Sequence, residues 1–244
     1  YGRGVSDDKG AAVASLYAMK ELMDEGCPMK KRVRLLLGTN EETGSACMEY
    51  YAKHGEPLNC GFTPDGYFPG IYAEKGMCAM TVYSKNTRII SMEGGFVTNA
   101  VCDRCTTRIN AADADADKLR AALGEMPLTS YSVSEEGGVI TIFAQGTAAH
   151  ASTPHLGVNA AGCTMAALLA AGMRDDFVDF YMSRIGTSCD GEGLGLKIED
   201  EYSDLTLNNG IVKTENGVIS ATIDIRYPVT YTPEKILELC APFL

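Results

Sequence analysis

The sequence predicts an α/β portion with a parallel-rich sheet and flanking helices, followed by an α+β portion. Over the first 76 residues, helix-period segments alternate with short apolar runs, a pattern typical of parallel strands joined by crossover helices. After that point hairpin-type segments become frequent. The chain has 244 residues with 45% hydrophobic and 22% charged content, enough for one large or two small domains with a buried core. We therefore expect two domains, 1–76 and 77–244.

The first portion contains two predicted helices and two predicted strands. Apolar residues recur at helical spacing over residues 13–23, and a Gly-Cys-Pro sequence at 26–28 is a stop signal. The short apolar run at 33–37 suits a strand buried on both faces. A second helix is predicted over 44–54 and a second short strand over 60–63. This order predicts a parallel sheet.

The second portion mixes strands, hairpins and helices. In chain order the sequence predicts a strand at 77–83, an acid-led helix at 113–123, a hairpin with arms at 131–134 and 139–144, and helices at 157–173 and 175–185. Asn216-Gly217 favours the positive φ angles of a type I′ turn and predicts a second hairpin, with a strand at 221–226. Thr232 then precedes Pro233, which indicates a capped helix start.

Charge and cysteine usage exclude several classes of protein. The net charge of −11 argues against nucleic acid as a partner, because phosphates require a basic surface. The most apolar run, 164–173, is far shorter than the roughly 20 residues that a membrane span needs, and no signal peptide is visible. The nine irregularly spaced cysteines indicate reduced thiols in a cytoplasmic protein. Cys102 and Cys105 form a lone CxxC, which we interpret as two half-buried strand residues in preference to a redox pair or zinc knuckle.

Three acidic motifs each lie at the end of a predicted strand or at the start of a predicted helix. Asp7 lies in GRGVSDDKG, where it could also cap a helix. Glu41 and Glu42 follow the predicted strand at 33–37; one can bind a metal ion while its neighbour acts as general base, and the alternative is a pair of solvated glutamates that begins a helix. Asp65 precedes Gly66, where a turn is the alternative. Acids at the carboxyl ends of neighbouring parallel strands converge in space and attract divalent cations.

Four motifs carry a resemblance to a known family. GRGVSDDKG, GTNEETGS, TPDGYFP and EKG, in this order, resemble the PepV-like zinc-dependent dipeptidases of the aminoacylase and carboxypeptidase G metallopeptidase superfamily. The resemblance implies that Asp7 bridges two zinc ions, that Glu41 is the general base, and that Glu42 and Asp65 each bind one zinc ion. Cobalt or manganese could replace zinc.

The second portion resembles the lid domain of the same family. Residues 146–154 match the motif G-x-x-A-H-(A/S)-x-x-P, which implies that His150 polarises the scissile carbonyl and stabilises the oxyanion. DIRYP at 224–228 implies that Arg226 binds the terminal carboxylate of the substrate, which suits the planar guanidinium. Asn99 resembles a substrate-contacting Asn of the lid.

The resemblance therefore predicts metal-dependent hydrolysis of the peptide bond of small dipeptides by a monomer. Hydrolysis of another small amide, such as an N-acyl or N-succinyl amino acid, is the alternative, and a non-catalytic lid or assembly module is a third. The family's H-x-D motif and C-terminal His ligand are not among these residues. We therefore expect an internal piece with a truncated lid, which alone binds zinc weakly and hydrolyses nothing, because catalytic zinc needs three protein ligands.

Overall fold

The computed structural model describes residue 2 and residues 4–41, 44–66 and 68–244. The chain divides into two compact units, Tyr1–Tyr72 and Ala73–Leu244. The assignment of a catalytic portion to residues 1–76 and of a lid domain to residues 77–244 stays a prediction.

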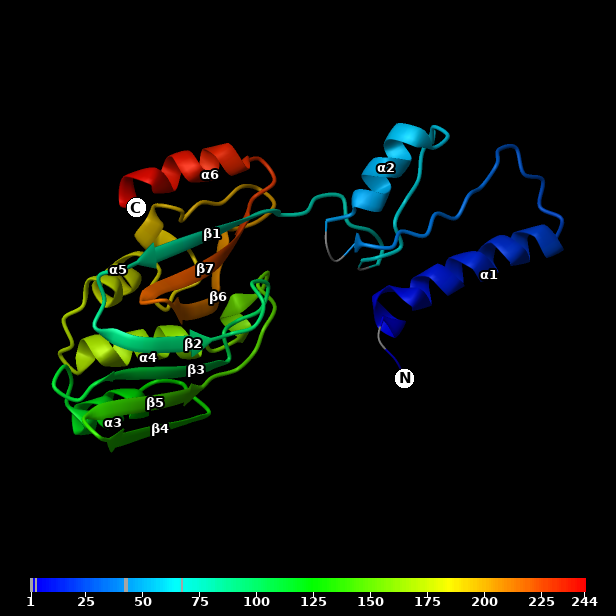
Figure 1. The fold of residues 1–244 in the computed structure, drawn as a ribbon. Coiled ribbons are helices and arrows are strands. Elements are labelled where there is room, and N and C mark those ends of the chain that lie inside the picture. The colour runs from blue at the N-terminus through cyan, green and yellow to red at the C-terminus, as the bar shows by residue number, and fades with distance from the viewer. Residues whose placement is uncertain (1, 3, 42–43, 67) are drawn as a thin grey trace. The chain divides into compact units, whose positions relative to one another are not determined.

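The first unit is helical in its described part. A π-helical turn, Val5–Lys9, leads into α1 (Gly10–Asp24), and α2 (Ala46–His54) follows (Figure 1). These helices confirm the two predicted over 13–23 and 44–54. Every described residue of this unit is exposed or half-buried, so its apolar side chains pack against no closed core among the described residues.

The two strands predicted in the first unit do not form. A strand requires a neighbour that pairs with its backbone N–H and C=O groups, and neither 33–37 nor 60–63 has such a neighbour among the described residues. The run at 33–37 is also not buried, since Val33 and Leu37 are 50% and 70% exposed. The predicted parallel-rich character is therefore absent from the described part of the first unit.

The second unit is built on one seven-stranded sheet in the order β1-β7-β6-β2-β3-β5-β4, with every pair antiparallel (Figure 1). The strands are β1 (Gly76–Ser84), β2 (Ile89–Gly94), β3 (Arg104–Asn110), β4 (Ser130–Glu136), β5 (Val139–Gln145), β6 (Thr206–Glu215) and β7 (Val218–Tyr227). With the helices, this sheet gives an α/β fold whose strands are antiparallel.

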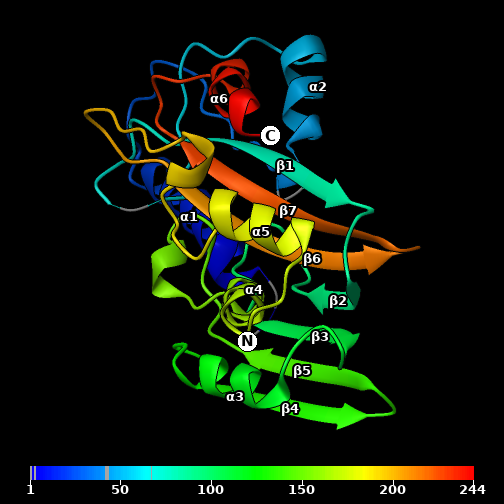
Figure 2. The same cartoon turned by 90° about the vertical axis from the view of Figure 1, so that its left-hand side faces the viewer.

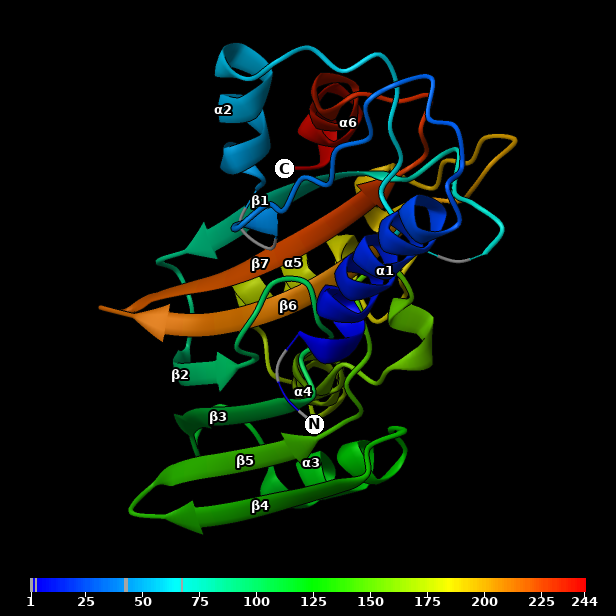
Figure 3. The ribbon, with the colours of Figure 1, turned by 90° about the vertical axis from the view of Figure 1, so that its right-hand side faces the viewer.

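Three helices lie on one face of that sheet. They are α3 (Ala116–Gly124), α4 (Ala160–Ala170) and α5 (Asp176–Arg184) (Figures 2 and 3). Most residues of α4 are small and buried, and their small size lets the helix pack close to the strands. A fourth helix, α6 (Pro233–Cys240), begins at the Thr232 cap and buries Ile236 and Cys240 in the same core. The helices predicted at 113–123, 157–173 and 175–185 are thus confirmed, with shorter bounds.

Both predicted hairpins are confirmed. Asn216 and Gly217, between β6 and β7, have φ angles of 51° and 74°, as a type I′ turn requires. Gly137 and Gly138 also have positive φ in the turn between β4 and β5. The alternating burial of β7 turns its odd-numbered residues from Ile219 to Tyr227 toward the helices, so the even-numbered residues face the other side of the sheet.

One buried carboxylate fastens α5 to the connection between β1 and β2. Asp175 is 4% exposed, and its Oδ1 accepts hydrogen bonds from the backbone N–H groups of Phe177 and Val178, each at 3.0 Å. Its Oδ2 accepts from the Thr87 hydroxyl at 3.0 Å and from the Arg88 backbone N–H. A single side chain thus caps the helix and anchors a distant loop.

Replacing this carboxylate should lower the stability of the second unit. We expect Asp175→Ala to reduce the free energy of unfolding by about 2–4 kcal/mol, because it removes a helix cap and leaves buried donors without their charged acceptor. Urea unfolding followed by circular dichroism measures the change. Asp176→Ala is the matched control, since Asp176 is exposed and its side chain accepts from Asn86 at the surface. Equal losses in the two variants would contradict this account.

Candidate active site

Asp7 lies at the turn into α1 but does not cap that helix. The residue at the N-cap is Lys9, and no side-chain hydrogen bond caps α1. Asp7 interrupts the π-helical turn with extended dihedral angles (φ −125°, ψ 97°), and its side chain is exposed. The alternative role as a helix cap is therefore wrong, and the carboxylate stays accessible to a ligand.

Glu41 lies in the turn that leads into α2. The backbone C=O of Asn40 accepts from Ser45 N at 2.9 Å, and its side-chain Oδ1 accepts from Cys47 N at 3.0 Å. These bonds fix the turn on both sides of Glu41, whose side chain is exposed. Glu42, the predicted zinc ligand beside it, lies outside the described residues.

Backbone N–H groups of the same turn act on a thiol. They come from Thr39 and Asn40, they point at the sulfur of Cys47, and they lower the pKa of that thiol. The N–H of Thr39 lies 3.4 Å from Cys47 Sγ. The turn therefore presents N–H groups that favour a negative charge.

The predicted convergence of carboxylates is not met by the described residues. Asp65 is exposed, like Asp7 and Glu41. Among the described residues, which exclude Glu42, no three His, Cys, Asp or Glu side chains are grouped so that they could hold a metal ion. The oxygen donors suit a divalent cation chemically, but the described part of the chain does not assemble a metal centre from them.

His150 and Asn99 lie on two loops of the second unit that pair with each other. Ala100 and His150 form an antiparallel bridge. On either side of it, Ala151 N donates to Asn99 O and Val101 N donates to Ala149 O, both at 2.9 Å. The side chains of Asn99 and His150 are exposed. Two residues that are 51 positions apart in the sequence are thereby fixed as neighbours.

A buried Asn on β6 holds the Asn99 loop. Asn208 is 2% exposed, and its Nδ2 donates to the backbone C=O of Thr98 at 3.1 Å and of Ala100 at 2.9 Å. These two carbonyls flank Asn99. Asn208 lies opposite Asp224 on β7, in the strand register. The loop is therefore tied to the strand pair that carries Arg226.

The loop approaches β6 so closely that two glycines are required. A Cβ on Gly95, whose φ is +72°, would lie 1.8 Å from the backbone C=O of Gly210. A Cβ on Gly210 would lie 2.4 Å from Thr98 O. Such distances are incompatible with any larger residue, so Gly95 and Gly210 let the Asn99 loop lie directly on the strand.

Arg226 forms a two-point ion pair with Asp224 on the same face of β7. Its Nε donates to Oδ1 at 2.6 Å and its Nη2 donates to Oδ2 at 3.0 Å. The side chains of Arg226 and Asp224 are 17% and 7% exposed. Because a guanidinium has five N–H groups, Asp224 leaves both N–H groups of Nη1 and one of Nη2 unused. The Nη1–Nη2 edge of the guanidinium can therefore donate two hydrogen bonds to a second carboxylate.

These contacts bring three of the predicted site residues into one region of the second unit. The bridge between Ala100 and His150 joins the two loops, and Asn208 connects the Asn99 loop to β6, beside Asp224 and Arg226 of β7. Thr206 of β6, opposite Arg226, adds a long hydrogen bond of 3.4 Å to Ala151 O. The region thus contains an imidazole, an amide and a guanidinium, which together suit a small molecule with a carbonyl and a carboxylate.

Asn208 and Asp224, which position this region, were not among the predicted site residues. Asn208 is one of two adjacent asparagines that follow Leu207 in β6, and a buried amide there indicates hydrogen bonds to neighbouring backbone. Asp224 stands two residues before Arg226, a spacing that places both on one face of a strand. Both signals were present in the sequence, but the residues that Asn208 and Asp224 bond are identified only by the fold.

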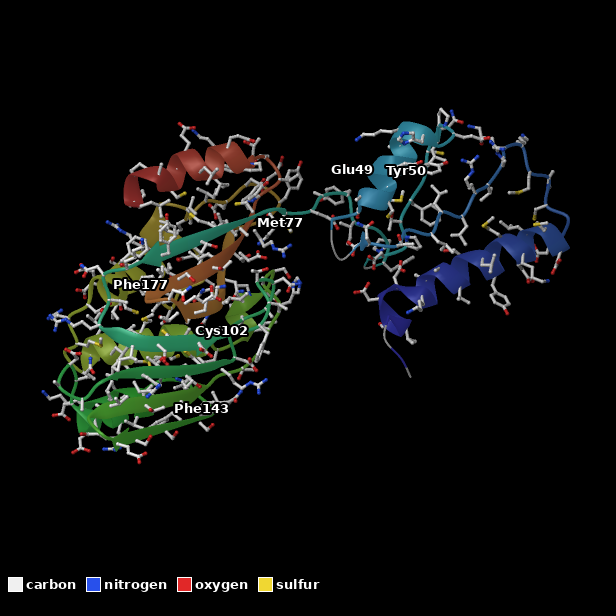
Figure 4. All side chains as sticks on the ribbon, viewed as in Figure 1. Glu49, Tyr50, Met77, Cys102, Phe143 and Phe177 are labelled. Atoms are coloured by element: carbon white, nitrogen blue, oxygen red, sulfur yellow. The ribbon has the colours of Figure 1, made fainter. Side chains whose placement is uncertain are left out.

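The CxxC pair is structural. Cys102, labelled in Figure 4, and Cys105 on β3 are buried. Burial raises the pKa of the Cys102 thiol to about 11 and raises that of Cys105 further. All nine cysteines are free thiols. A protonated thiol is a poor nucleophile, which supports a structural role for the pair. The predicted half-burial is wrong, since both side chains are buried, and Cys105 lies on a strand whereas Cys102 precedes β3.

Comparison with known proteins identifies similar sequences. The family model described as peptidase family M20/M25/M40 matches residues 1–212. The chain is 33% identical to "Putative dipeptidase YtjP" of Bacillus subtilis, over 98% of this chain and 54% of that protein. It is 31% identical to a protein of Staphylococcus haemolyticus and to one of Staphylococcus aureus, both also named "Putative dipeptidase", over 97% of this chain and 54% of each relative. The chain thus spans about half the length of these relatives.

Among the described residues, no helix combines the length and apolar character needed to span a bilayer.

Proposed function

The chain belongs to peptidase family M20/M25/M40, and from this premise we propose that the whole protein hydrolyses the peptide bond of dipeptides. The observation that carries the proposal is the region of the second unit in which Asn99, His150 and Arg226 are tied together through β6 and β7. The relatives' names point to the same substrate class.

Arg226 is proposed to bind the free carboxylate of the substrate. Asp224 holds the Nε–Nη2 edge of the guanidinium, so the Nη1–Nη2 edge is oriented and available for a two-point contact. The ion pair also stabilises the largely buried guanidinium, which would otherwise be an unpaired charge. A carboxylate requirement at this point limits the substrate to short molecules.

His150 and Glu41 are proposed to act on the scissile amide. An N–H of His150 donates to the carbonyl oxygen and stabilises the negative charge that develops there. Glu41 takes the proton of the attacking water and delivers it to the leaving amine. Asn99, beside His150, contacts the substrate. Each role depends on a side chain that is exposed in its own unit.

The proposal includes a metal centre and a lid. Asp7, Glu42 and Asp65 would be ligands of two divalent ions, with zinc the expected metal and cobalt or manganese as alternatives; the described residues gather no such group, and no step above is assigned to the metal. Residues 1–76 would form part of a catalytic domain with a parallel-rich sheet, and residues 77–244 a lid that excludes water on closing. We further propose a cytoplasmic monomer.

A substrate panel tests the proposal in the whole protein. It contains a dipeptide, the same dipeptide as its C-terminal amide, an N-acetyl amino acid and an N-succinyl amino acid. We expect kcat/KM to be highest for the dipeptide, and lower by at least about tenfold for the amide, because one charge-assisted contact is lost. Preference for either N-acylated compound would favour the alternative amide hydrolase. No turnover of any would favour a non-catalytic role.

Removing the guanidinium should abolish the discrimination against the amide. We expect Arg226→Met to raise KM for the dipeptide by about 10–100-fold, which is the loss of a two-point charged hydrogen bond, and to change the amide little. Arg226→Lys should fall between, since an ammonium retains charge without the fork. The control is Arg108→Met, an exposed position on β3. An unchanged dipeptide-to-amide ratio in Arg226→Met would contradict the assignment.

A further inference from the structure

We propose that Ser152 is a positioning residue that fixes neutral His150 as the tautomer with its proton on Nε2. The proposal concerns the imidazole itself, and its consequence for catalysis rests on the proposed function. It is carried by two contacts to one ring nitrogen, both made by Ser152. Ser152 occupies a variable position of the sequence motif that contains His150.

The two contacts determine which nitrogen is protonated. The backbone N–H of Ser152 points at His150 Nδ1 at 3.2 Å, and the Ser152 hydroxyl lies 2.7 Å from the same atom. A backbone N–H can only donate, so Nδ1 must offer its lone pair. A proton on Nδ1 would place two donors against each other. In the neutral ring the proton is therefore on Nε2, and the hydroxyl adds a second donor to Nδ1.

The backbone on both sides keeps this arrangement in place. Thr153 N donates to His150 O at 2.9 Å, which closes a tight turn around Ser152. The bridge to Ala100 holds the backbone of His150, and Ala151, between His150 and Ser152, is buried. These contacts hold the backbone on both sides of the ring, and a local side-chain-to-backbone hydrogen bond orients the ring on it.

His150 presents an N–H group to a substrate in this arrangement. With Nδ1 occupied by Ser152, the remaining ring nitrogen is Nε2, and it carries the proton. An N–H stabilises a developing oxyanion, whereas the lone pair of the other tautomer would repel it. Ser152 thus selects the donor form without touching the substrate. The selection holds for the neutral ring, the form in which tautomers exist.

The chain has three histidines, and they provide internal references for a direct measurement. His54 Nδ1 lies 3.0 Å from the backbone C=O of Tyr50. A carbonyl only accepts, so His54 should have its proton on Nδ1, the opposite tautomer. Long-range proton–nitrogen NMR spectra of ¹⁵N-histidine-labelled protein, above the pH at which the rings protonate, distinguish the two forms. His54→Gln and His155→Gln variants assign the signals.

We expect the His150 signals to show a protonated Nε2 and an unprotonated Nδ1. In Ser152→Ala the backbone N–H remains but one donor is lost, so the ratio of tautomers should shift about fivefold toward Nδ1–H, the effect of one neutral hydrogen bond. Ser152→Thr, which keeps the hydroxyl, should restore the ratio. Ser132→Ala, on the edge strand β4, should leave it unchanged. A protonated Nδ1 in the unaltered protein, or an unshifted ratio in Ser152→Ala, would overturn the proposal.

Kinetics of the whole protein test the consequence separately. Ser152→Ala should lower kcat for a dipeptide by about two- to fivefold with KM nearly unchanged, because the donor acts mainly in the transition state. Unchanged kcat with a shifted tautomer ratio would overturn the catalytic consequence. If the unaltered protein cleaves no dipeptide, the proposed function fails, and the NMR result still decides the role of Ser152.

Discussion

Glu41→Gln should reduce kcat of the whole protein for a dipeptide by about 10²–10⁴-fold. Glutamine keeps the size and polarity of the side chain but cannot accept the proton of the attacking water, and a positioned general base contributes about that factor. The turn before α2 is fixed by the bonds of Asn40, so the substitution should leave the local backbone unchanged. Steady-state kinetics, with metal content from elemental analysis, measure the effect.

The metal content separates two roles for this carboxylate. If Glu41 is the base, Glu41→Gln should retain the metal while losing turnover. Loss of metal together with activity would make Glu41 a ligand and contradict the assignment. Glu49→Gln is the matched control, because Glu49, labelled in Figure 4, is an exposed carboxylate on the neighbouring α2. It should keep kcat within about twofold.

Local sequence signals predicted the elements that depend on local chemistry. Asn216-Gly217 specifies a turn with two positive φ angles, and Thr232 with Pro233 specifies a helix start; both act within a few residues. Strand β2 was not predicted, and β3 was predicted only through the interpretation of Cys105 as a strand residue, because the apolar pattern of both strands is irregular. In β3 the buried positions are Cys105, Thr107 and Ile109, and a buried threonine interrupts the apolar alternation.

The predicted strands of the first unit illustrate the opposite error. An apolar run such as that at 33–37 satisfies the pattern of a buried strand, but the pattern does not include the partner that a strand needs. Val33 and Leu37 are exposed in the structure, and the run pairs with nothing among the described residues. The apolar pattern alone thus predicted a strand that the structure does not form.

In the candidate site, too, local motifs predicted some residues, whereas residues that act through long-range contacts were not predicted. Asn99, His150 and Arg226 were predicted from motifs, but Asn208 acts on Thr98 and Ala100 across more than a hundred residues. No local pattern contains that contact, because it arises only when β6 is placed beside the loop after β2. The residues proposed to contact a substrate were therefore easier to predict than those that hold them in position.

His150→Ala should lower kcat for a dipeptide by about 10²–10³-fold. The loss corresponds to about 2.7–4 kcal/mol, the value of a hydrogen-bond donor directed at a developing oxyanion. Because this contact strengthens in the transition state, kcat should fall more than KM changes. His150→Gln can still donate an N–H from a shorter side chain, so it should retain more activity than His150→Ala.

His155→Ala is the matched control for that experiment. His155 is exposed and lies five residues after His150, in the short 3₁₀ turn Pro154–Leu156, without a role in the proposed chemistry. Its removal should leave kcat within about twofold. Comparable losses in the two alanine variants would mean that the loop as a whole, and not the His150 donor, supports turnover. A loss confined to His150 that His150→Gln partly reverses would instead identify the donated N–H as the active feature, since the backbone bridge to Ala100 does not depend on the side chain.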